Sequence, residues 1–166
     1  MEQKRVFSLL VDNTSSVLSR VSGLFTRRGY NIHSIAAGVT MDPRFTRITV
    51  VVDGDDQILE QIEKQLRKMV DVRDVKTLNP DSSVCRELIL VKVRANVEER
   101  QAILAIADIF RAKVVDVGMN SLIIEMTGTL SKIEAFLNLI KDYEIQELAR
   151  TGITGLSRGM HDVKWF

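Results

Sequence analysis

Apolar residues in the first half of the chain follow two spacings, and the change between them marks element boundaries. Val17 and Val21 recur at helical intervals, as do Ile58 and Ile62, whereas the runs between them are continuous and rich in Val and Ile, as in buried strands. This pattern predicts strands over 4–11, 32–41, 45–52 and 72–78 and helices over 16–28 and 56–69. The expected order of elements is therefore βαββαβ.

The second half repeats this order, although its residues hardly resemble those of the first half. We expect strands over 87–94, 113–117, 121–127 and 145–150 and helices over 98–110 and 132–143. Ser131 and Glu134 have the spacing of a capping box at the start of the last helix. The polar segment 79–83 contains a proline and predicts a linker, while the glycines of 151–159 lack P-loop spacing and suggest a docking tail or a flexible end.

Two such units in tandem predict an α+β protein made of two ferredoxin-like βαββαβ domains. We place the first domain at residues 1–79 and the second at residues 84–166. Each domain would lay two helices on one face of a four-stranded sheet and leave the other face and the edge strands uncovered. Because the strands carry Val and Ile on both faces, as in ITVVV at 48–52, we expect self-association.

Composition and charge exclude several classes of function. The 166 residues are 45% apolar and 27% charged, as in a soluble globular protein, and the net charge of +1 favours neither nucleic acid nor an anionic membrane as a partner. No apolar run approaches the roughly 20 residues that span a bilayer. A single cysteine and an N-terminus without the pattern of a secretory signal indicate a cytoplasmic protein.

Groups suited to catalysis or metal binding are scarce. His33 and His161 lack partners at metal-ligand spacing, and Cys85 has no histidine close to it in sequence. The RNA-recognition motif shares βαββαβ topology, but segment 45–52 carries one aromatic residue and lacks the basic-Gly-aromatic pattern that stacks bases. We therefore expect no catalytic residue, no metal and no cofactor in this chain.

Polar side chains flank the first predicted helix. Asn13 closes the first strand and Asn31 opens the second, and we expect both at one end of the strand–helix–strand unit. A helix N-terminus suits a carboxylate, and the two amides with Asp12 suit the ammonium group of an amino acid. The alternative reading is that Asn13, Thr14 or Ser15 merely caps the helix and that a glycine turn ends it.

Four segments go beyond topology, namely LFTRRGYNIHSI, DDQILEQIEKQLRKMVDVRDVKTL, RELILVKV and ELARTGITGLSRG. In this order, and over nearly the whole chain, they resemble the regulatory (small) subunit of acetolactate synthase, also called acetohydroxyacid synthase. The resemblance implies that the first domain is an ACT domain, which binds an amino acid at a domain interface. It also implies a non-catalytic subunit in branched-chain amino-acid biosynthesis.

Such a subunit docks onto the catalytic large subunit, raises its activity and makes it sensitive to feedback inhibition by valine. The large subunit is expected to use thiamine diphosphate, Mg²⁺ and FAD, none of which this chain would bind. By resemblance, the effector-binding residues are Asp12, Asn13, Thr14, Ser15, Ser16, Val17, Leu18, Asn31 and Ile32. Ser16 stands where many family members have glycine, so its side chain could either add a hydrogen bond or obstruct the ligand.

We expect two copies to form a homodimer by pairing their ACT domains edge to edge. Each effector would then lie between the turn 12–18 of one copy and the segment 31–34 of the other, and leucine or isoleucine could also bind. The competing interpretation is a free-standing amino-acid-sensing ACT protein without an enzyme partner. That interpretation explains the topology but not RELILVKV or ELARTGITGLSRG.

Overall fold

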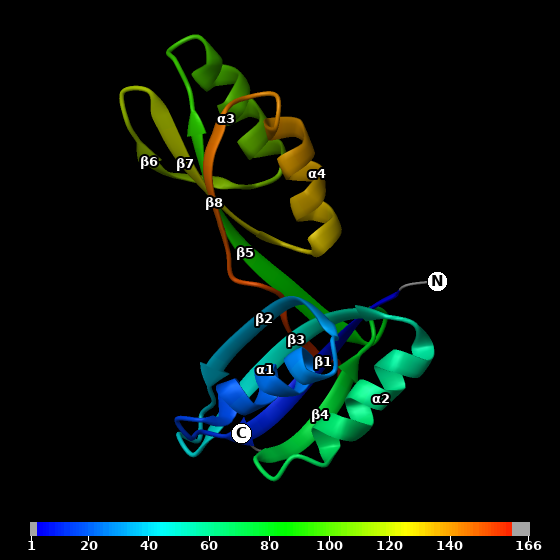
Figure 1. Cartoon of the computed structure of the whole chain (residues 1–166). Helices are drawn as coiled ribbons and strands as arrows, with labels where there is room; N and C mark the ends of the chain where they lie inside the picture. Colours follow the sequence, from blue (N-terminus) through cyan, green and yellow to red (C-terminus); the bar gives the residue numbers. More distant parts are fainter. Residues whose placement is uncertain (1–2, 161–166) are drawn as a thin grey trace. The chain divides into compact units, whose positions relative to one another are not determined.

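The computed structural model describes residues 3–160 and divides into two compact units (Figure 1). Unit 1 contains the chain up to Cys85 and again from Ile153, whereas unit 2 contains the residues from Arg86 to Gly152. Each unit has the expected order of strands and helices, so the predicted α+β fold with two βαββαβ units is confirmed.

Unit 1 is built on a four-stranded antiparallel sheet with the strand order β2-β3-β1-β4. Its elements are β1 (Gln3–Asp12), α1 (Val17–Arg27), β2 (Asn31–Val39), β3 (Phe45–Gly54), α2 (Asp56–Arg67) and β4 (Val72–Leu78). Both helices lie on one face of the sheet (Figure 1). Their apolar stripes pack against alternate residues of β1 and β3 in one buried core, which includes Phe7, Leu9, Val21, Phe25, Val50 and Ile62.

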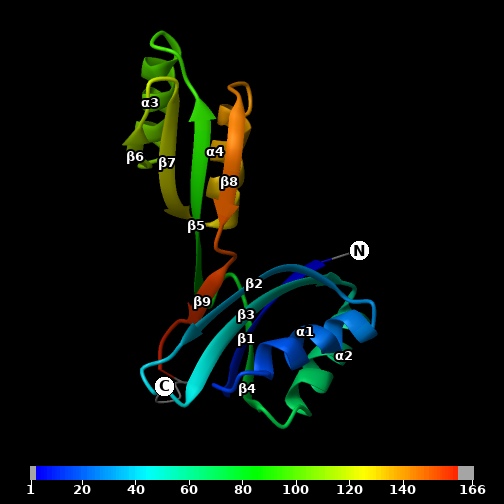
Figure 2. The same ribbon diagram turned by 60° about the vertical axis from the view of Figure 1, so that its left-hand side comes forward.

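Unit 2 repeats this layout with the strand order β6-β7-β5-β8. Its elements are β5 (Ser83–Arg94), which begins in unit 1, α3 (Glu99–Ile109), β6 (Lys113–Val117), β7 (Ser121–Gly128), α4 (Leu130–Ile140) and β8 (Ile145–Arg150). Figure 2 shows the sheet of this unit in front of its two helices. A separate core fills the space between them, and Phe110 and Phe136 meet in it edge to face with ring centroids 5.4 Å apart.

The C-terminal segment forms a strand rather than the expected docking tail or flexible end. Residues Thr154–Ser157 make β9, which pairs with β5 (Figure 2), and the N–H of Arg158 donates to the carbonyl of Ser82 at 2.7 Å. Ile153, just before β9, is buried. Through β9, the segment 153–160 therefore packs with unit 1, and the domain limits of 1–79 and 84–166 stay predictions.

Helix capping also differs from the prediction. The capping box at Ser131 and Glu134 is wrong, since α4 begins at Leu130 and the Thr129 hydroxyl accepts from the N–H of Lys132 at 3.4 Å. A reciprocal box starts α3 instead. There Asn96 Oδ1 accepts from the N–H of Glu99 at 2.8 Å, and Glu99 Oε2 accepts from the N–H of Asn96 at 3.1 Å.

The sheet of unit 1 is buried on both faces at its centre. The residues of the central strands that point away from the helices are Ser8, Leu10, Thr49 and Val51, and each is at most 2% exposed. The face that we expected to stay uncovered is therefore covered at its centre within the chain. The edge strand β2 remains open, with Ile35 and Val39 exposed by 36% and 60%.

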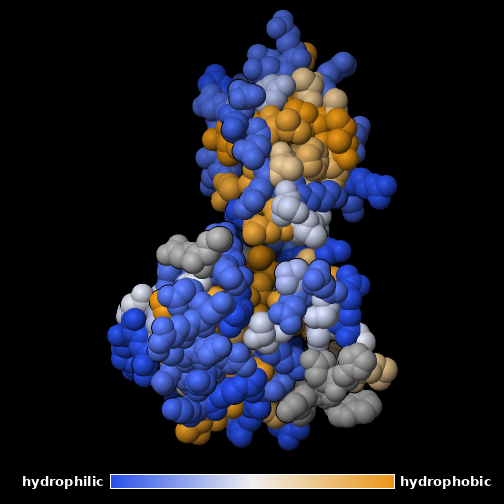
Figure 3. All heavy atoms as spheres, turned by 90° about the vertical axis from the view of Figure 1, so that its right-hand side faces the viewer, coloured by the Kyte–Doolittle hydropathy of each residue, from blue (hydrophilic) through white to orange (hydrophobic). Residues whose placement is uncertain are grey.

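Unit 2 carries exposed apolar side chains on its helices. Leu104 and Ile109 of α3 and Leu139 of α4 are 39%, 75% and 49% exposed. Figure 3, viewed from the side on which α4 lies in Figure 1, shows apolar spheres gathered on the face of unit 2 that is turned to the viewer. Among the described residues, none of the helices has the length and apolar character needed to cross a membrane.

Two glycines should respond in opposite ways to substitution by alanine. A Cβ at Gly155 in β9 would lie 2.6 Å from Cys85 Sγ and 2.8 Å from the Val84 carbonyl oxygen, so we expect Gly155→Ala to lose about 1–3 kcal/mol of unfolding free energy. Gly23 lies inside α1 with nothing within 4 Å, so Gly23→Ala should gain up to about 1 kcal/mol. Urea unfolding of both variants measures this. If both substitutions changed the unfolding free energy in the same direction, the close packing of β9 would be contradicted.

Candidate functional site

The start of α1 has no side-chain cap. Ser16 occupies the N-cap position without a capping hydrogen bond, and the first turn contains no acidic residue. In α2 and α4 the N-cap side chains of Asp55 and Thr129 accept from the first turn, and in α3 the N-cap Glu98 makes no such bond but Asn96, two residues earlier, accepts from the N–H of Glu99. The N–H of Val17 donates to the carbonyl of Thr14 at 3.3 Å, and the next N–H groups of a helix start without a side-chain cap attract an anion, such as the carboxylate of an amino acid.

Asn13 ties the turn after β1 to the β2–β3 hairpin. Its Nδ2 donates to the carbonyl of Pro43 at 2.9 Å, and its Oδ1 accepts from Thr46 Oγ1 at 3.2 Å. Its backbone N–H donates to the carbonyl of Arg44 at 2.8 Å. An asparagine amide offers two hydrogens and two lone pairs, so one of each remains for a ligand.

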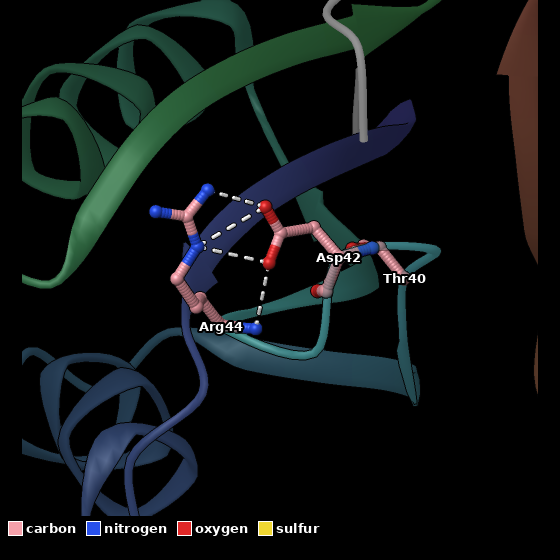
Figure 4. A network of polar contacts seen from close by, with 3 residues as sticks. All are labelled: Thr40, Asp42 and Arg44. Carbon is pink, nitrogen blue, oxygen red and sulfur yellow. Dashed lines mark hydrogen bonds and ion pairs between the residues drawn. The ribbon is translucent and has the colours of Figure 1, made fainter.

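The hairpin that holds Asn13 is ordered by Asp42 (Figure 4). The carboxylate of Asp42 accepts from the backbone N–H of Arg44 at 3.0 Å and from Nη2 of the same residue at 2.6 Å. Hydrogen bonds from Arg44 lower the pKa of Asp42. Thr40 Oγ1 accepts from the N–H of Asp42 at 3.2 Å. The carbonyls of Pro43 and Arg44 therefore meet Asn13 from an ordered turn.

The alternative interpretation, in which a polar side chain caps the start of α1 and a glycine turn ends it, is right only for the end of the helix. Gly29 has a φ of +67°, and the N–H of Tyr30 donates to the carbonyl of Phe25 at 3.0 Å, as in a Schellman end. A glycine turn therefore ends α1, which confirms that part. Capping of α1 by a polar side chain of the preceding turn is wrong, because the helix has no side-chain cap.

Asp12 is paired within the chain. Its two carboxylate oxygens accept from Nε and Nη2 of Arg73, each at 2.7 Å. These hydrogen bonds hold the pKa of Asp12 below its usual value. Asp12 would therefore meet an ammonium group only as one half of an ion pair, with most of its charge already neutralised.

Removal of this ion pair should change stability in a pH-dependent way. Because the pKa of Asp12 is lowered in the folded state, the pair stabilises the protein fully above the ordinary value of 3.8, and the effect is lost as the pH falls through the lowered pKa. We expect Asp12→Asn to be less stable than the parent at neutral pH and the difference to shrink in acid. Urea unfolding at neutral and at acidic pH measures the difference in unfolding free energy. Asp81→Asn, which lies in an exposed turn, is the control. A difference independent of pH would contradict the assignment.

Ser16 fits its position without backbone strain. Its φ of −104° is open to any residue, so the fold does not require glycine here. Its hydroxyl oxygen accepts from Arg20, whose Nη1 lies 2.8 Å from a carboxylate oxygen of the buried Asp71. The hydroxyl hydrogen of Ser16 can still donate to an anion.

The remaining residues of the turn take different positions. The N–H of Thr14 donates to the carbonyl of Asp12 at 2.9 Å, and the N–H of Val17 donates to that of Thr14 at 3.3 Å. Ser15 is exposed. Val17 is buried in the core, whereas Leu18 is 47% exposed and can contact a ligand or a second copy.

Asn31 lies at the far end of the sheet from Asn13. In the sheet register Asn31 faces Asp53 near the end of β3, whereas Asp12 faces Phe45 at its start. At roughly 3.3 Å per residue, these ends are about 25 Å apart. The expectation that the two asparagines gather at one end of the unit is wrong for a single chain, because α1 carries the chain back along the sheet before β2 begins.

The structure therefore divides the candidate residues into two groups. It brings together the turn 12–18 and leaves Asn31 and the half-buried Ile32 at the opposite end. Within one chain the two groups cannot contact the same small ligand.

Three supporting residues of the turn were not predicted, namely Arg20, Asp71 and Arg73. Arg20 stands four residues after Ser16, and this helical spacing could have indicated their contact. Arg73 contacts Asp12 across 61 positions of the sequence, and only the pairing of β1 with β4 brings them together. Such a contact leaves no local signal in the sequence.

The described residues contain no group of three or more His, Cys, Asp or Glu side chains that could hold a metal ion. His33 has its Nδ1 3.9 Å from a carboxylate oxygen of Asp53. His161 lies outside the described residues. The turn 12–18 offers the amide of Asn13, the hydroxyl of Ser16 and the backbone N–H groups at the start of α1, which suit the binding of a small polar molecule.

Comparison with known proteins identifies the family. A family profile described as "AHAS small subunit-like ACT domain" matches residues 7–74, and one described as "Small subunit of acetolactate synthase" matches residues 86–159. A probable acetolactate synthase small subunit of Methanothermobacter thermautotrophicus is 49% identical over 93% of this chain and 92% of its own length. The acetolactate synthase isozyme 3 small subunit of Escherichia coli is 45% identical, over 94% of this chain and 96% of that protein.

A solved structure agrees with these relatives. The acetolactate synthase small subunit from Thermotoga maritima superposes with a TM-score of 0.87 at 42% identity, and the match covers 95% of this chain and 99% of that one. Similarity of this extent in both sequence and fold confirms the resemblance described above. The chain belongs to the acetolactate synthase small-subunit family.

Proposed function

We propose that this chain docks onto the catalytic large subunit of acetolactate synthase, raises its activity and makes it sensitive to inhibition by valine. Its family makes it a regulatory subunit in branched-chain amino-acid biosynthesis and implies the large subunit as its partner. In this proposal the chain is itself non-catalytic, works in the cytoplasm and leaves thiamine diphosphate, Mg²⁺ and FAD to the large subunit. The observation that carries the effector role is the uncapped start of α1 beside Asn13.

The effector site would form between two copies of unit 1. β2 is an edge strand, and its last residue, Val39, faces Thr46, the residue that contacts Asn13. If the β2 strands of two copies pair antiparallel, the Asn31 end of one strand lies opposite the Val39 end of the other. Asn31 and Ile32 of one copy would then approach the turn 12–18 of its partner.

This arrangement assigns a task to each group of residues. The first turn of α1 and Asn13 would bind the carboxylate of the effector, while Leu18 and Ile32 would contact its isopropyl group. One methylene in an apolar pocket is worth about 1–3 kcal/mol, so selectivity among branched side chains should be modest. The effector would shift the complex toward its less active state by a coupling of about 1–3 kcal/mol, or roughly 5- to 150-fold in affinity.

The proposal is tested by measuring acetolactate formation with the cognate large subunit, with and without this chain, at increasing valine concentrations. Stimulation that valine reverses is the expected result. Stimulation without a valine response would support the large subunit as the partner but would overturn valine as the effector. No effect on a competent large subunit, combined with valine binding to the isolated chain, would instead favour a free-standing amino-acid sensor.

A further inference from the structure

Asp53 lies beside Asn31, and its carboxylate forms no ion pair with a lysine or arginine of the described chain. Asn31 Nδ2 donates to Asp53 Oδ2 at 3.3 Å, and the side chain of Asp53 is 21% exposed. Within the described chain its nearest cationic partner is His33, with 3.9 Å between Nδ1 and Oδ2, and this contact is an ion pair only when the imidazole is protonated. Lys4 faces Asp53 in the sheet register but makes no ion pair with it. Asp12, in contrast, is held by an arginine through both oxygens.

The contact with Asp53 orients the amide of Asn31. With Nδ2 turned toward the carboxylate, Oδ1 is the group that an approaching donor can reach, and a carbonyl oxygen only accepts hydrogen bonds. An acceptor oxygen next to a carboxylate suits a cationic donor. It disfavours a second carboxylate, because like charges would meet.

The surroundings add to this negative character. Asn31 and Asp53 border a hollow of about 330 Å³ that Asp55 and Gly54 also line. Asp55 caps α2 by accepting from the N–H of Ile58 at 2.8 Å, so its carboxylate is fixed there. Asp53 and the acceptor oxygen of Asn31 therefore suit a cationic group at this hollow, whereas the start of α1 at the other end of the sheet suits an anion.

We propose that Asp53 sets the polarity with which the amino-acid effector binds. The ammonium group lies at Asn31 and Asp53 of one copy, and the carboxylate lies at Asn13 and the start of α1 of the other. This inference rests on the proposed function, which supplies the effector and the pairing of β2 strands. Asp53 acts as a positioning and specificity-determining residue, because it orients Asn31 and supplies the counter-charge for a ligand that carries an amine.

The test compares two inhibitors of the complex between the large subunit and the full chain. L-valine carries the ammonium group, and 2-hydroxy-3-methylbutanoate replaces it with a hydroxyl. We expect the parent to prefer valine by about tenfold or more, since a hydrogen bond to a charged group contributes about 1.5–3 kcal/mol. Asp53→Asn, which keeps the shape of the side chain, should lose most of this preference by weakening valine alone.

Two further variants separate charge from structure. Asp53→Glu keeps the charge and should keep the preference for valine. Asp56→Asn removes a carboxylate three positions away that is exposed and pairs with Arg5 at 3.3 Å, and it should respond as the parent does. An effect of folding alone would weaken both inhibitors equally, whereas the loss of a counter-charge changes their ratio.

Each outcome decides a different question. A parent inhibited by valine together with an Asp53→Asn variant of unchanged preference overturns the role of Asp53 and leaves the proposed function standing. Equal weakening of both inhibitors in Asp53→Asn also overturns it. A parent that does not respond to valine overturns the proposed effector and this inference with it.

Discussion

Asn13→Ala should abolish the inhibition of the reconstituted enzyme at valine concentrations that inhibit the parent, while stimulation by the chain persists. The substitution removes the amide that lies beside the uncapped start of α1. A hydrogen bond to a charged group contributes about 1.5–3 kcal/mol, so the half-inhibitory concentration should rise by about 10- to 100-fold. Acetolactate formation measured against valine concentration gives both quantities.

Thr46→Val is the matched control for this substitution. It removes the 3.2 Å hydrogen bond from Thr46 to Asn13 Oδ1 but keeps the amide itself. We expect Thr46→Val to retain valine inhibition, because the contacts of Asn13 with Pro43 and Arg44 still hold the turn. If both variants lost valine inhibition to the same extent, Asn13 would act by holding the shape of the turn and not by contacting the ligand. Loss of stimulation by folded Asn13→Ala protein would refute the separation of effector binding from activation.

Excision of unit 2 should give a chain that folds and stimulates the large subunit but no longer responds to valine. Unit 1 has its own core, and β9 pairs with β5, so a short glycine-rich linker from Cys85 to Ile153 can keep both strands. We expect the activating surface on the open strands and α1 of unit 1. Unit 2 would stabilise the dimer and transmit the effector signal, so its loss removes the coupling of roughly 5- to 150-fold.

A chain that ends at Leu78 is the control for this design. It lacks β9, whose Gly155 lies against Leu78 and Cys85, and should therefore be less stable than the chain with the linker. Urea unfolding and the dimer content of both proteins distinguish loss of packing from loss of signal transmission. A full valine response after excision would exclude a necessary role of unit 2.

The fold was predictable from the sequence because its elements have strong local patterns. The stripe of Ile62 and Leu66 in α2 indicated the helix and its buried face, and both residues are fully buried. β9 gave no comparable signal, since four residues with one glycine and one exposed leucine do not show strand periodicity. Its pairing with β5 brings Gly155 next to Val84 and Cys85, which are distant in sequence, so no local pattern indicates it.

The candidate site was predictable only in part. The local sequence indicated a polar turn before α1, and the structure places residues 12–18 in that turn. The partner of Asp12 is 61 positions away, and the distance between Asn13 and Asn31 follows from the direction of α1 along the sheet. The sequence shows that both asparagines lie next to a strand end. It does not show at which end of the sheet each strand end lies, so the prediction placed the two asparagines together.

The uncapped start of α1 has a consequence for the lifetime of the protein. Donors without acceptors make the first turn of a helix the part that opens most readily, so its amide hydrogens should exchange faster than those of the capped α2. A ligand that binds only the folded state adds about 2.7 kcal/mol of stability at a hundred times its dissociation constant. Under the proposed function valine is such a ligand, so a high valine concentration should slow the degradation of this subunit and raise its abundance.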